Sequence, residues 1–271
     1  MKVIISHDVD HITVCEHRND LVLPKHIVRS FIELGAGYIA PSEFLQRLNN
    51  ILKNQWQNLE ALMKFNKKNN IPATFFIGVS KGKGLIYSLK DAEVWIKEII
   101  RQGFDVGVHG ITFNNIDDIK TEYITFRSLS GLENIGIRMH YLRHDESTLR
   151  FLDKTGYLFD TTIYEMKNPY KVGVLWEFPL HIMDGYIIER NGRWQNQNLK
   201  QCKQQTERII EKAFENGINY FTILFHDRYF CDGFKTWQAW YIWLIQYLID
   251  NKFKFISYRE AINELMAEEA P

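Results

Sequence analysis

The chain has 271 residues, of which 45% are hydrophobic and 14% aromatic, so it can bury a large core. Lysine plus arginine and aspartate plus glutamate both total 33, which argues against a partner held by charge alone, such as nucleic acid or an acidic membrane surface. No apolar run has the length of a membrane span, and the three cysteines lack CxxC spacing. Since Met1-Lys2 leads directly into the first strand, we expect no signal peptide and one cytoplasmic domain, residues 1–271.

Short apolar runs alternate with amphipathic segments along the chain. Val3–Ile5 opens the first strand, 11–40 is expected to be irregular, and one helix is predicted from Ser42 to about Asn69. Further strands are predicted at 73–78, 104–110, 157–163, 175–180, 220–227 and 253–257, with a polar-rich stretch at 135–145. Further helices are predicted at 91–102, 116–130, 147–154, 199–215, 234–250 and from Tyr258. This alternation predicts a parallel α/β fold, and seven or eight units suggest a barrel.

The first strand ends in the sequence Ser6-His-Asp-Val-Asp10. Because side chains alternate along a strand, Asp8 and Asp10 are expected on the same side. Two adjacent carboxylates repel one another unless a cation or a proton lies between them. The pattern therefore indicates either a metal site with a neighbouring catalytic carboxylate or an inert, solvated turn.

Other reactive side chains follow later strands: His109, then Arg138 and His140, then His226. A single histidine at a strand end is usually structural, but parallel strands would bring all of these side chains to one rim. One carboxylate and one imidazole suit a divalent cation such as Zn²⁺ and leave positions open for water and substrate, with a second carboxylate as general base and another histidine as general acid.

Five ordered motifs resemble the polysaccharide deacetylase (NodB-homology) family. They are Ile4–Asp10, Ile71–Phe76, Asp105–His109, Arg138–Tyr141 with the helix and Gly-Tyr step that follow, and Leu224–His226. The resemblance implies a distorted (β/α) barrel of seven to eight strands. A second set of segments resembles a branch associated with surface-polysaccharide and O-antigen biosynthesis: Arg138–Arg143, Phe159–Thr162, Glu177–Leu180 with Asp184, and Phe225–Arg228. From sequence alone, Asp184 either faces the substrate or caps a turn.

The resemblance also implies roles for individual residues. Asp8 is then the general base, and Arg138 holds it ionised. Asp10 and His109 are metal ligands, the backbone N–H of Tyr141 helps to stabilise the oxyanion, and His226 protonates the departing amine.

One position departs from the family pattern. The family places a second metal histidine four residues after the first, and here that residue is Phe113. His140 is the preferred replacement, ahead of His7, His11 and His144; alternatively, metal binding is weak or lost. His17 and His26 are expected at the surface.

We therefore expect a metal-dependent hydrolase, with zinc the preferred ion and cobalt or manganese as alternatives. The expected reaction removes an N-acetyl or similar acyl group from an amino sugar or glycan in surface-polysaccharide or O-antigen biosynthesis. A nucleotide-linked or lipid-linked sugar is one option for the substrate. Two rival functions stay open: a carbohydrate-binding homologue without catalysis, and a metal-dependent amidohydrolase that acts on a small non-sugar amide.

Overall fold

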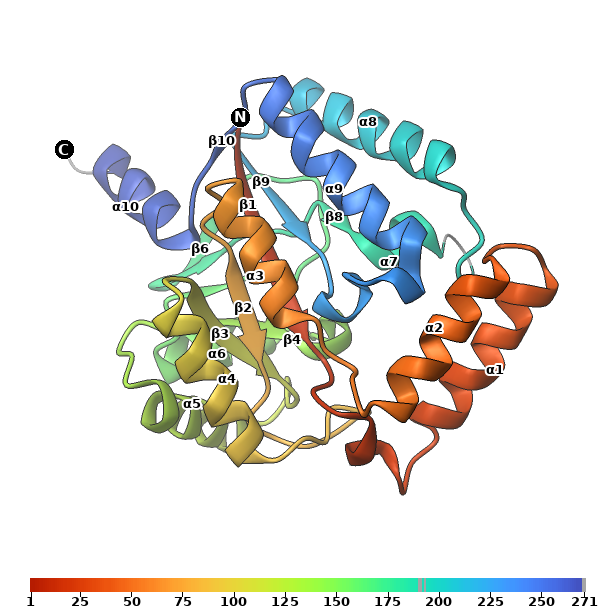
Figure 1. The fold of residues 1–271 in the computed structure, drawn as a ribbon. Helices are drawn as coiled ribbons and strands as arrows, with labels where there is room; N and C mark the ends of the chain where they lie inside the picture. Colours follow the sequence, from red (N-terminus) through yellow and green to blue (C-terminus); the bar gives the residue numbers. More distant parts are fainter. Residues whose placement is uncertain (190–191, 193, 270–271) are drawn as a thin grey trace.

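The computed structural model describes residues 1–189, 192 and 194–269. A curled sheet forms its centre, and helices pack around the sheet (Figure 1). The strands are Lys2–Val9 (β1), Thr74–Ile77 (β2), Asp105–Gly110 (β3), Gly136–Met139 (β4), Phe159–Asp160 (β5), Tyr170–Val172 (β6), Leu175–Glu177 (β7), Ile182–Met183 (β8), Tyr220–Leu224 (β9) and Lys254–Phe255 (β10).

The sheet order is β6-β7-β5-β4-β3-β2-β1-β9-β8, and β10 pairs with β1 outside this path. All of these pairs are parallel except β6 with β7. Every predicted strand is present, β4 lies in the polar-rich stretch, and the short strands β6 and β8 are additional. The predicted α/β fold of distorted barrel type is confirmed.

Ten α-helices are present in the described part of the chain. They are Val22–Gly35 (α1), Pro41–Leu52 (α2), Leu59–Lys68 (α3), Leu89–Arg101 (α4), Ile116–Ser130 (α5), Thr148–Thr155 (α6), Asp184–Ile188 (α7), Leu199–Glu215 (α8), Lys235–Asp250 (α9) and Tyr258–Glu269 (α10). Four short 3-10 helices are Val14–His17 (η1), His140–Leu142 (η2), Asp227–Tyr229 (η3) and Asp232–Phe234 (η4). Among the helices described, none has both the length and the apolar character needed to cross a membrane.

The two faces of β1 bury different cores. Val3 and Ile5 belong to the large core between the sheet and the helices, whereas Ile4 joins an aromatic cluster with Phe76 and Tyr258. Neighbouring strands approach this cluster closely, because a Cβ atom on Gly136 would lie only 2.1 Å from the Phe159 ring. Period-two alternation then places Ser6 and Asp8 on the face of Ile4, which directs the reactive side chains toward the inside of the curled sheet.

The segment between β1 and β2 is more regular than predicted. Residues 11–40 contain η1 and α1, so the expectation of an irregular stretch is wrong. The predicted helix 42–69 is two helices, because the chain turns at Asn54, which has a left-handed backbone with φ of 55°. His17 and His26 are buried, with 1% and 9% exposure, and not at the surface as predicted.

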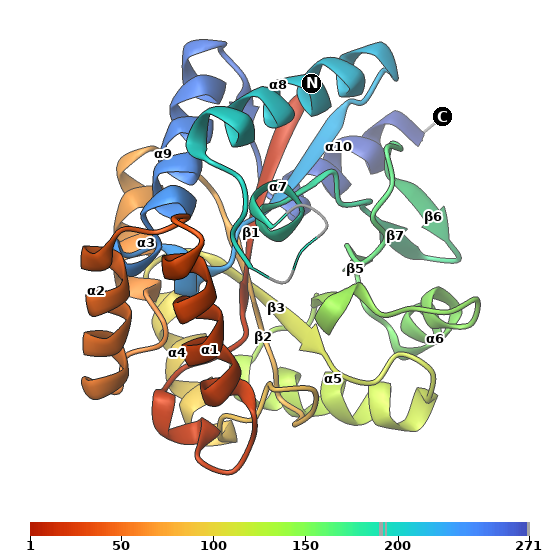
Figure 2. The same cartoon turned by 90° about the vertical axis from the view of Figure 1, so that its right-hand side faces the viewer.

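Helices α1 and α2 form a hairpin at the periphery of the molecule (Figure 2). Arg47 of α2 is buried, and its Nη1 lies 2.5 Å from Oε2 of Glu33 in α1. The Arg47 Nε–H also donates to the carbonyl oxygen of Gly233 in η4 at 2.6 Å. This buried ion pair therefore fixes the hairpin to the segment that follows β9.

Candidate metal and catalytic site

The predicted reactive residues meet at the C-terminal ends of four parallel strands. Asp8 lies near the end of β1 and Asp10 directly follows it, while His109 lies in β3 and Arg138 in β4. The register aligns His109 with Arg138, so the two strands deliver their side chains at one level. His140 and His226 come directly after β4 and β9.

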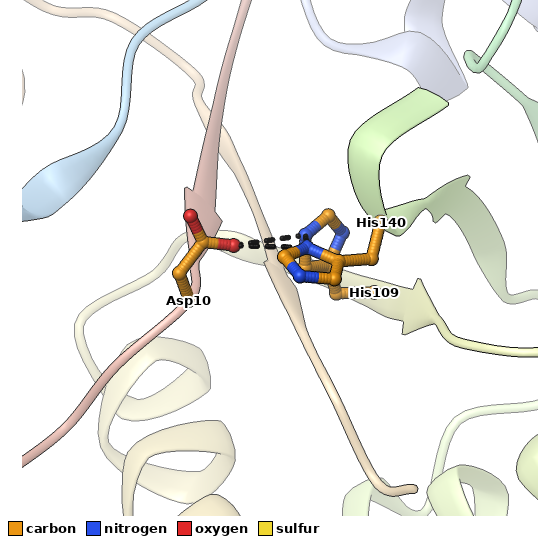
Figure 3. Close-up of side chains that lie close together, drawn as sticks. All are labelled: Asp10, His109 and His140. Carbon is orange, nitrogen blue, oxygen red and sulfur yellow. Dashed lines mark hydrogen bonds and ion pairs between the residues drawn. The ribbon is translucent and has the colours of Figure 1, made fainter. Parts of the chain in front are cut away.

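Asp10, His109 and His140 form a compact triangle of possible ligand atoms (Figure 3). Asp10 Oδ1 lies 3.2 Å from both His109 Nε2 and His140 Nδ1, and these two nitrogens are 3.0 Å apart. Ligands at 2.0–2.1 Å around a tetrahedral zinc ion are separated by about 3.3 Å. The three atoms therefore already have nearly the spacing that a zinc ion requires.

The other nitrogen of each imidazole is held by a backbone carbonyl. His109 Nδ1–H donates to the Arg138 oxygen at 3.1 Å, and His140 Nε2–H donates to the Lys83 oxygen at 3.3 Å. In neutral rings, the nitrogens that face Asp10 then carry lone pairs, so three acceptor atoms point toward one another. Only a positive charge between them relieves this repulsion, and the donor set therefore fits a divalent cation.

The charge of Asp10 is stabilised by its neighbours. Burial raises the pKa of Asp10, but in the metal-free protein His140 and His109, when they carry protons toward the carboxylate, outweigh burial and hold the pKa well below its usual value. An ionised carboxylate at this point is the form that binds a metal.

Asp8 sits beside the triangle and is paired with a buried arginine. Arg138 Nη1 lies 2.9 Å from Asp8 Oδ1, and Asp8 Oδ2 is 3.8 Å from His109 Nε2. Burial raises the pKa of Asp8, but the charges of Arg138 and His109 outweigh burial, so the pKa lies below its usual value. The carboxylate is therefore held ionised next to the possible metal position.

His226 approaches Asp10 from the segment after β9. Its Nε2 is 3.7 Å from Asp10 Oδ2, and its Nδ1–H donates to Asp184 Oδ1 at 2.8 Å. Burial lowers the pKa of His226, but Asp184 together with Asp10 raises it to about 10. The imidazole is thus held protonated and is suited to act as an acid. Of the two options for Asp184, the buried position against His226 agrees with a role in the site.

The turn after β4 has an unusual backbone. Tyr141 and Leu142 both have left-handed conformations, with φ of 59° and 52°. Such conformations cost energy in residues other than glycine and often occur at functional sites. The turn places Tyr141 directly after His140, and its ring packs on that imidazole at 4.1 Å between centroids.

Phe113 does not take part in this cluster. Its ring packs against the core under the Arg143 guanidinium, and its carbonyl oxygen accepts from Thr148 Oγ1 at 3.0 Å. The third ligand atom of the triangle comes instead from His140.

The other candidate ligands lie elsewhere. His7 is buried on the helix side of β1, between the Phe225 carbonyl and Asn66. His11 belongs to a separate group of side chains, and His144 is exposed and turns back to the Leu142 carbonyl.

The roles of two supporting groups could not be predicted from the sequence. The Lys83 carbonyl orients His140 from the loop after β2, and a backbone group of this kind leaves no trace in residue types. Asp227 is buried beside the site, and burial raises its pKa to about 8. Asp227 belongs to the segment Phe225–Arg228 that resembles the surface-polysaccharide branch, but the residue pattern did not predict its burial.

A small cavity of about 20 Å³, room for about one water molecule, lies between the α1–α2 hairpin and the segment after His226. Its lining includes Trp56, Asn58 and three cationic or titratable side chains, His26, Arg47 and Arg228. His26 Nδ1, Arg47 Nη2 and Arg228 Nε have no hydrogen-bond partner among the described residues. Buried donors without partners indicate room for an acceptor, such as an oxygen of a ligand or of water.

No family model and no curated protein sequence matches the chain. Among solved structures, one from Mycobacterium smegmatis assigned to the polysaccharide deacetylases aligns with a TM-score of 0.67 at 15% identity, covering 100% of this chain and 91% of that one. Puue allantoinase aligns with a TM-score of 0.62 at 12% identity, covering 99% and 90%. A CE4 family pseudoenzyme from Bacillus anthracis aligns with a TM-score of 0.51 at 11% identity, covering 96% and 64%. At these identities the likeness concerns the fold, and the chain has the fold of the polysaccharide deacetylases.

Proposed function

We propose that this protein is a metal-dependent hydrolase that removes an N-acetyl or similar acyl group from an amino sugar. The observation that carries this proposal is the triangle of Asp10, His109 and His140 between an ionised carboxylate, Asp8, and a protonated imidazole, His226. A metal at this point, a base and an acid are the three components that amide hydrolysis needs.

Asp10, His109 and His140 would hold the ion, with zinc preferred and cobalt or manganese as alternatives. When bound, such an ion lowers the pKa of water and polarises the amide carbonyl. Asp8 accepts the proton of the attacking water, and Arg138 keeps Asp8 ionised and oriented. The backbone N–H of Tyr141 donates to the developing oxyanion.

His226 donates its proton to the amine nitrogen as the carbon–nitrogen bond breaks. Its ion pair with Asp184 keeps it protonated at neutral pH, so the proton is available when the leaving group needs it. An amine is a poor leaving group without protonation, and a positioned acid typically contributes a factor of about 10² to 10⁴.

The substrate is placed in surface-polysaccharide or O-antigen biosynthesis, on a nucleotide- or lipid-linked sugar. Support for this pathway comes from the segments Arg138–Arg143 and Phe225–Arg228, which resemble the surface-polysaccharide branch of the family. A cytoplasmic location fits the three free cysteines Cys15, Cys202 and Cys231.

Two other functions have specific support. The similarity to a pseudoenzyme favours a sugar-binding protein without catalysis, and the similarity to an allantoinase favours a hydrolase for a small non-sugar amide. The paired Asp8–Arg138 and His226–Asp184 groups argue for catalysis over binding alone, because a binding module has no use for a base and an acid on opposite sides.

Acetate release from a panel of substrates tests the proposal. The zinc-loaded protein should deacetylate N-acetylated sugars, and Asp8→Asn should lower kcat/KM by a factor on the order of 10² to 10⁴ while the bound zinc is retained. Hydrolysis of allantoin or simple amides only would favour the small-amide hydrolase. Sugar binding that needs no zinc and yields no acetate would overturn the enzyme assignment.

A further inference from the structure

A second group of possible ligands lies in the segment that follows β1. His11, Glu16 and His17 each offer one atom, and these atoms lie within 4.8 Å of one another. His17 Nε2 is 2.8 Å from His11 Nδ1 and 3.0 Å from Glu16 Oε1, and the third side of the triangle is 3.7 Å. The mean of these separations is close to the ligand spacing of about 3.3 Å around tetrahedral zinc.

The hydrogen bonds around this group orient it in the manner of a metal site. His17 Nδ1–H donates to Asp20 Oδ2 at 2.8 Å, so in a neutral ring its Nε2 carries a lone pair that faces Glu16 and His11. A carboxylate on the outer nitrogen of a histidine is the usual support of a metal-binding imidazole. Asp20 is itself fixed, because its Oδ1 accepts from the backbone N–H of Val22 at 2.9 Å.

Glu16 is equally fixed. Its carboxylate accepts from the backbone N–H groups of Ile12 and Thr13, at 3.2 and 3.0 Å, while Oε1 remains within reach of both imidazoles. The Trp56 ring packs on His11 and His17, with centroids 5.2 and 5.0 Å away. All three side chains are therefore largely buried and held before any ligand binds.

This group is distinct from the triangle around Asp10. His11 follows Asp10 in sequence, but the carboxylate of Asp10 meets His109 and His140, whereas His11 meets residues of η1. Among the described residues these are the two groups that bring three such ligand atoms together.

We propose that His11, Glu16 and His17 bind a second divalent metal ion, which ties η1 to the end of β1. Two imidazoles and one carboxylate suit zinc better than calcium or magnesium, which prefer oxygen ligands. The ion has a structural role: it fixes the chain immediately after Asp10 and so holds that carboxylate in place. The competing occupant of the same point is a single proton shared by the three acceptors.

Metal content per chain decides between the two occupants. The chelator-treated protein is reloaded with Zn²⁺, freed of excess metal and measured by mass spectrometry, with titration calorimetry for affinity. Wild type should hold two ions, and His17→Gln and His109→Gln should each hold one. His26→Gln is the matched control, since His26 also packs on Trp56 but belongs to neither ligand group, and it should hold two.

The outcomes separate this site from the proposed active site. One ion in wild type that is kept in His17→Gln and lost in His109→Gln would overturn the second site and leave the proposed function intact. One ion that is lost in His17→Gln and kept in His109→Gln would support the second site and contradict the metal site of the proposed function. No ion in wild type would overturn both.

Two further measurements do not depend on the folding of His17→Gln. Asp20→Asn leaves all three ligands in place, and loss of the supporting carboxylate should weaken binding at this site by about 10- to 100-fold. Anomalous diffraction at the zinc edge from wild-type crystals should show a peak between His11 and His17. An empty position there at saturating zinc, or unchanged affinity in Asp20→Asn, would contradict the proposal.

Discussion

The Arg138 side chain makes several hydrogen bonds in addition to its salt bridge with Asp8. Its guanidinium donates to Asp8, Ser6 and Tyr258, and to both oxygens of Thr161. The planar fork of arginine allows such contacts in fixed directions, which a lysine ammonium cannot reproduce. Arg138 thus links Asp8 at the end of β1 to the start of α10.

Metal affinity tests whether His140 replaces the histidine that the family has at the position of Phe113. His140→Ala should weaken zinc binding at the Asp10 site by at least tenfold, because it removes one of three ligands. Phe113→His should leave the affinity nearly unchanged, because the triangle is already complete. Both substitutions are made in the His17→Gln background, which lacks the second site. Zinc titration calorimetry then measures the affinity of the Asp10 site alone.

The opposite pattern would show that His140 is a bystander. Unchanged affinity in His140→Ala together with tighter binding in Phe113→His means that Asp10 and His109 hold the ion with water alone. His144→Ala, in an exposed residue of the same loop, is the control and should not change the affinity.

Much of the site could be predicted at the level of single residues. Alternation along β1 correctly placed Asp8 and Asp10 on one side, and the strand ends correctly brought His109 and His226 to the same rim. The burial of His17 could not be predicted from its residue type. Its ring is buried because Glu16 and Asp20 satisfy both of its nitrogen atoms. The roles of Asp8, Asp10, His109 and His226 in binding and catalysis remain predictions.

At the level of elements, the hairpin α1–α2 depends on a buried ion pair. Arg47→Met leaves Glu33 with a single charged partner, Arg29, and should lower the free energy of unfolding by about 3 to 5 kcal/mol. Urea denaturation monitored by circular dichroism measures the change.

An exposed pair provides the control for this substitution. Lys97 contacts Glu93 on the surface of α4 and is 64% exposed, so Lys97→Met should change stability by less than about 1 kcal/mol. Equal losses in the two variants would mean that the buried pair does not anchor the hairpin.

Helix prediction succeeded where local signals were complete. Helix α5 has the predicted bounds 116–130, since Asn115 caps its start and Gly131 ends it in a left-handed conformation. Helix α1 was missed because its pattern is inverted: His26 and Glu33 face inward, whereas Val28 and Phe31 are 57% and 58% exposed. A helix that buries polar side chains against a neighbouring helix, as α1 does with Glu33 against Arg47 of α2, cannot be recognised from hydrophobic periodicity.

For the whole molecule, Asp227 predicts a dependence of stability on pH. Its pKa is about 8 in the folded chain, mainly through burial, and near 4 when unfolded. Between these values the folded state keeps a proton that the unfolded state releases, so stability falls as the pH rises, by up to about 1.4 kcal/mol per pH unit.

The variant Asp227→Asn should remove this contribution. We expect the difference in unfolding free energy, wild type minus Asp227→Asn, to decrease steadily from pH 5 to pH 8 in metal-free protein. Denaturation curves at four pH values measure it, and a difference that does not depend on pH would show that Asp227 is ionised in the folded state.

The architecture of the whole chain was the most predictable level, because alternating strands and helices restrict the possible folds. The pairing of β1 with β10 and the additions β6 and β8 could not be predicted, since strands of two or three residues carry no periodicity.

The position of β1 in the sheet affects how the chain folds. Strand β1 pairs with β9 as well as with β2, and His7 Nδ1 donates to the carbonyl oxygen of Phe225, 218 residues later. Contacts between residues so far apart in the sequence form slowly. The chain must first lose the conformational entropy of the long loop between them, and only then do the contacts stabilise it. During synthesis Asp8 and Asp10 leave the ribosome early, but they wait for β9 to bring His226 beside them. A nascent chain that stops before β9 therefore exposes an unpaired edge of β1, where chaperones or aggregation would compete with folding.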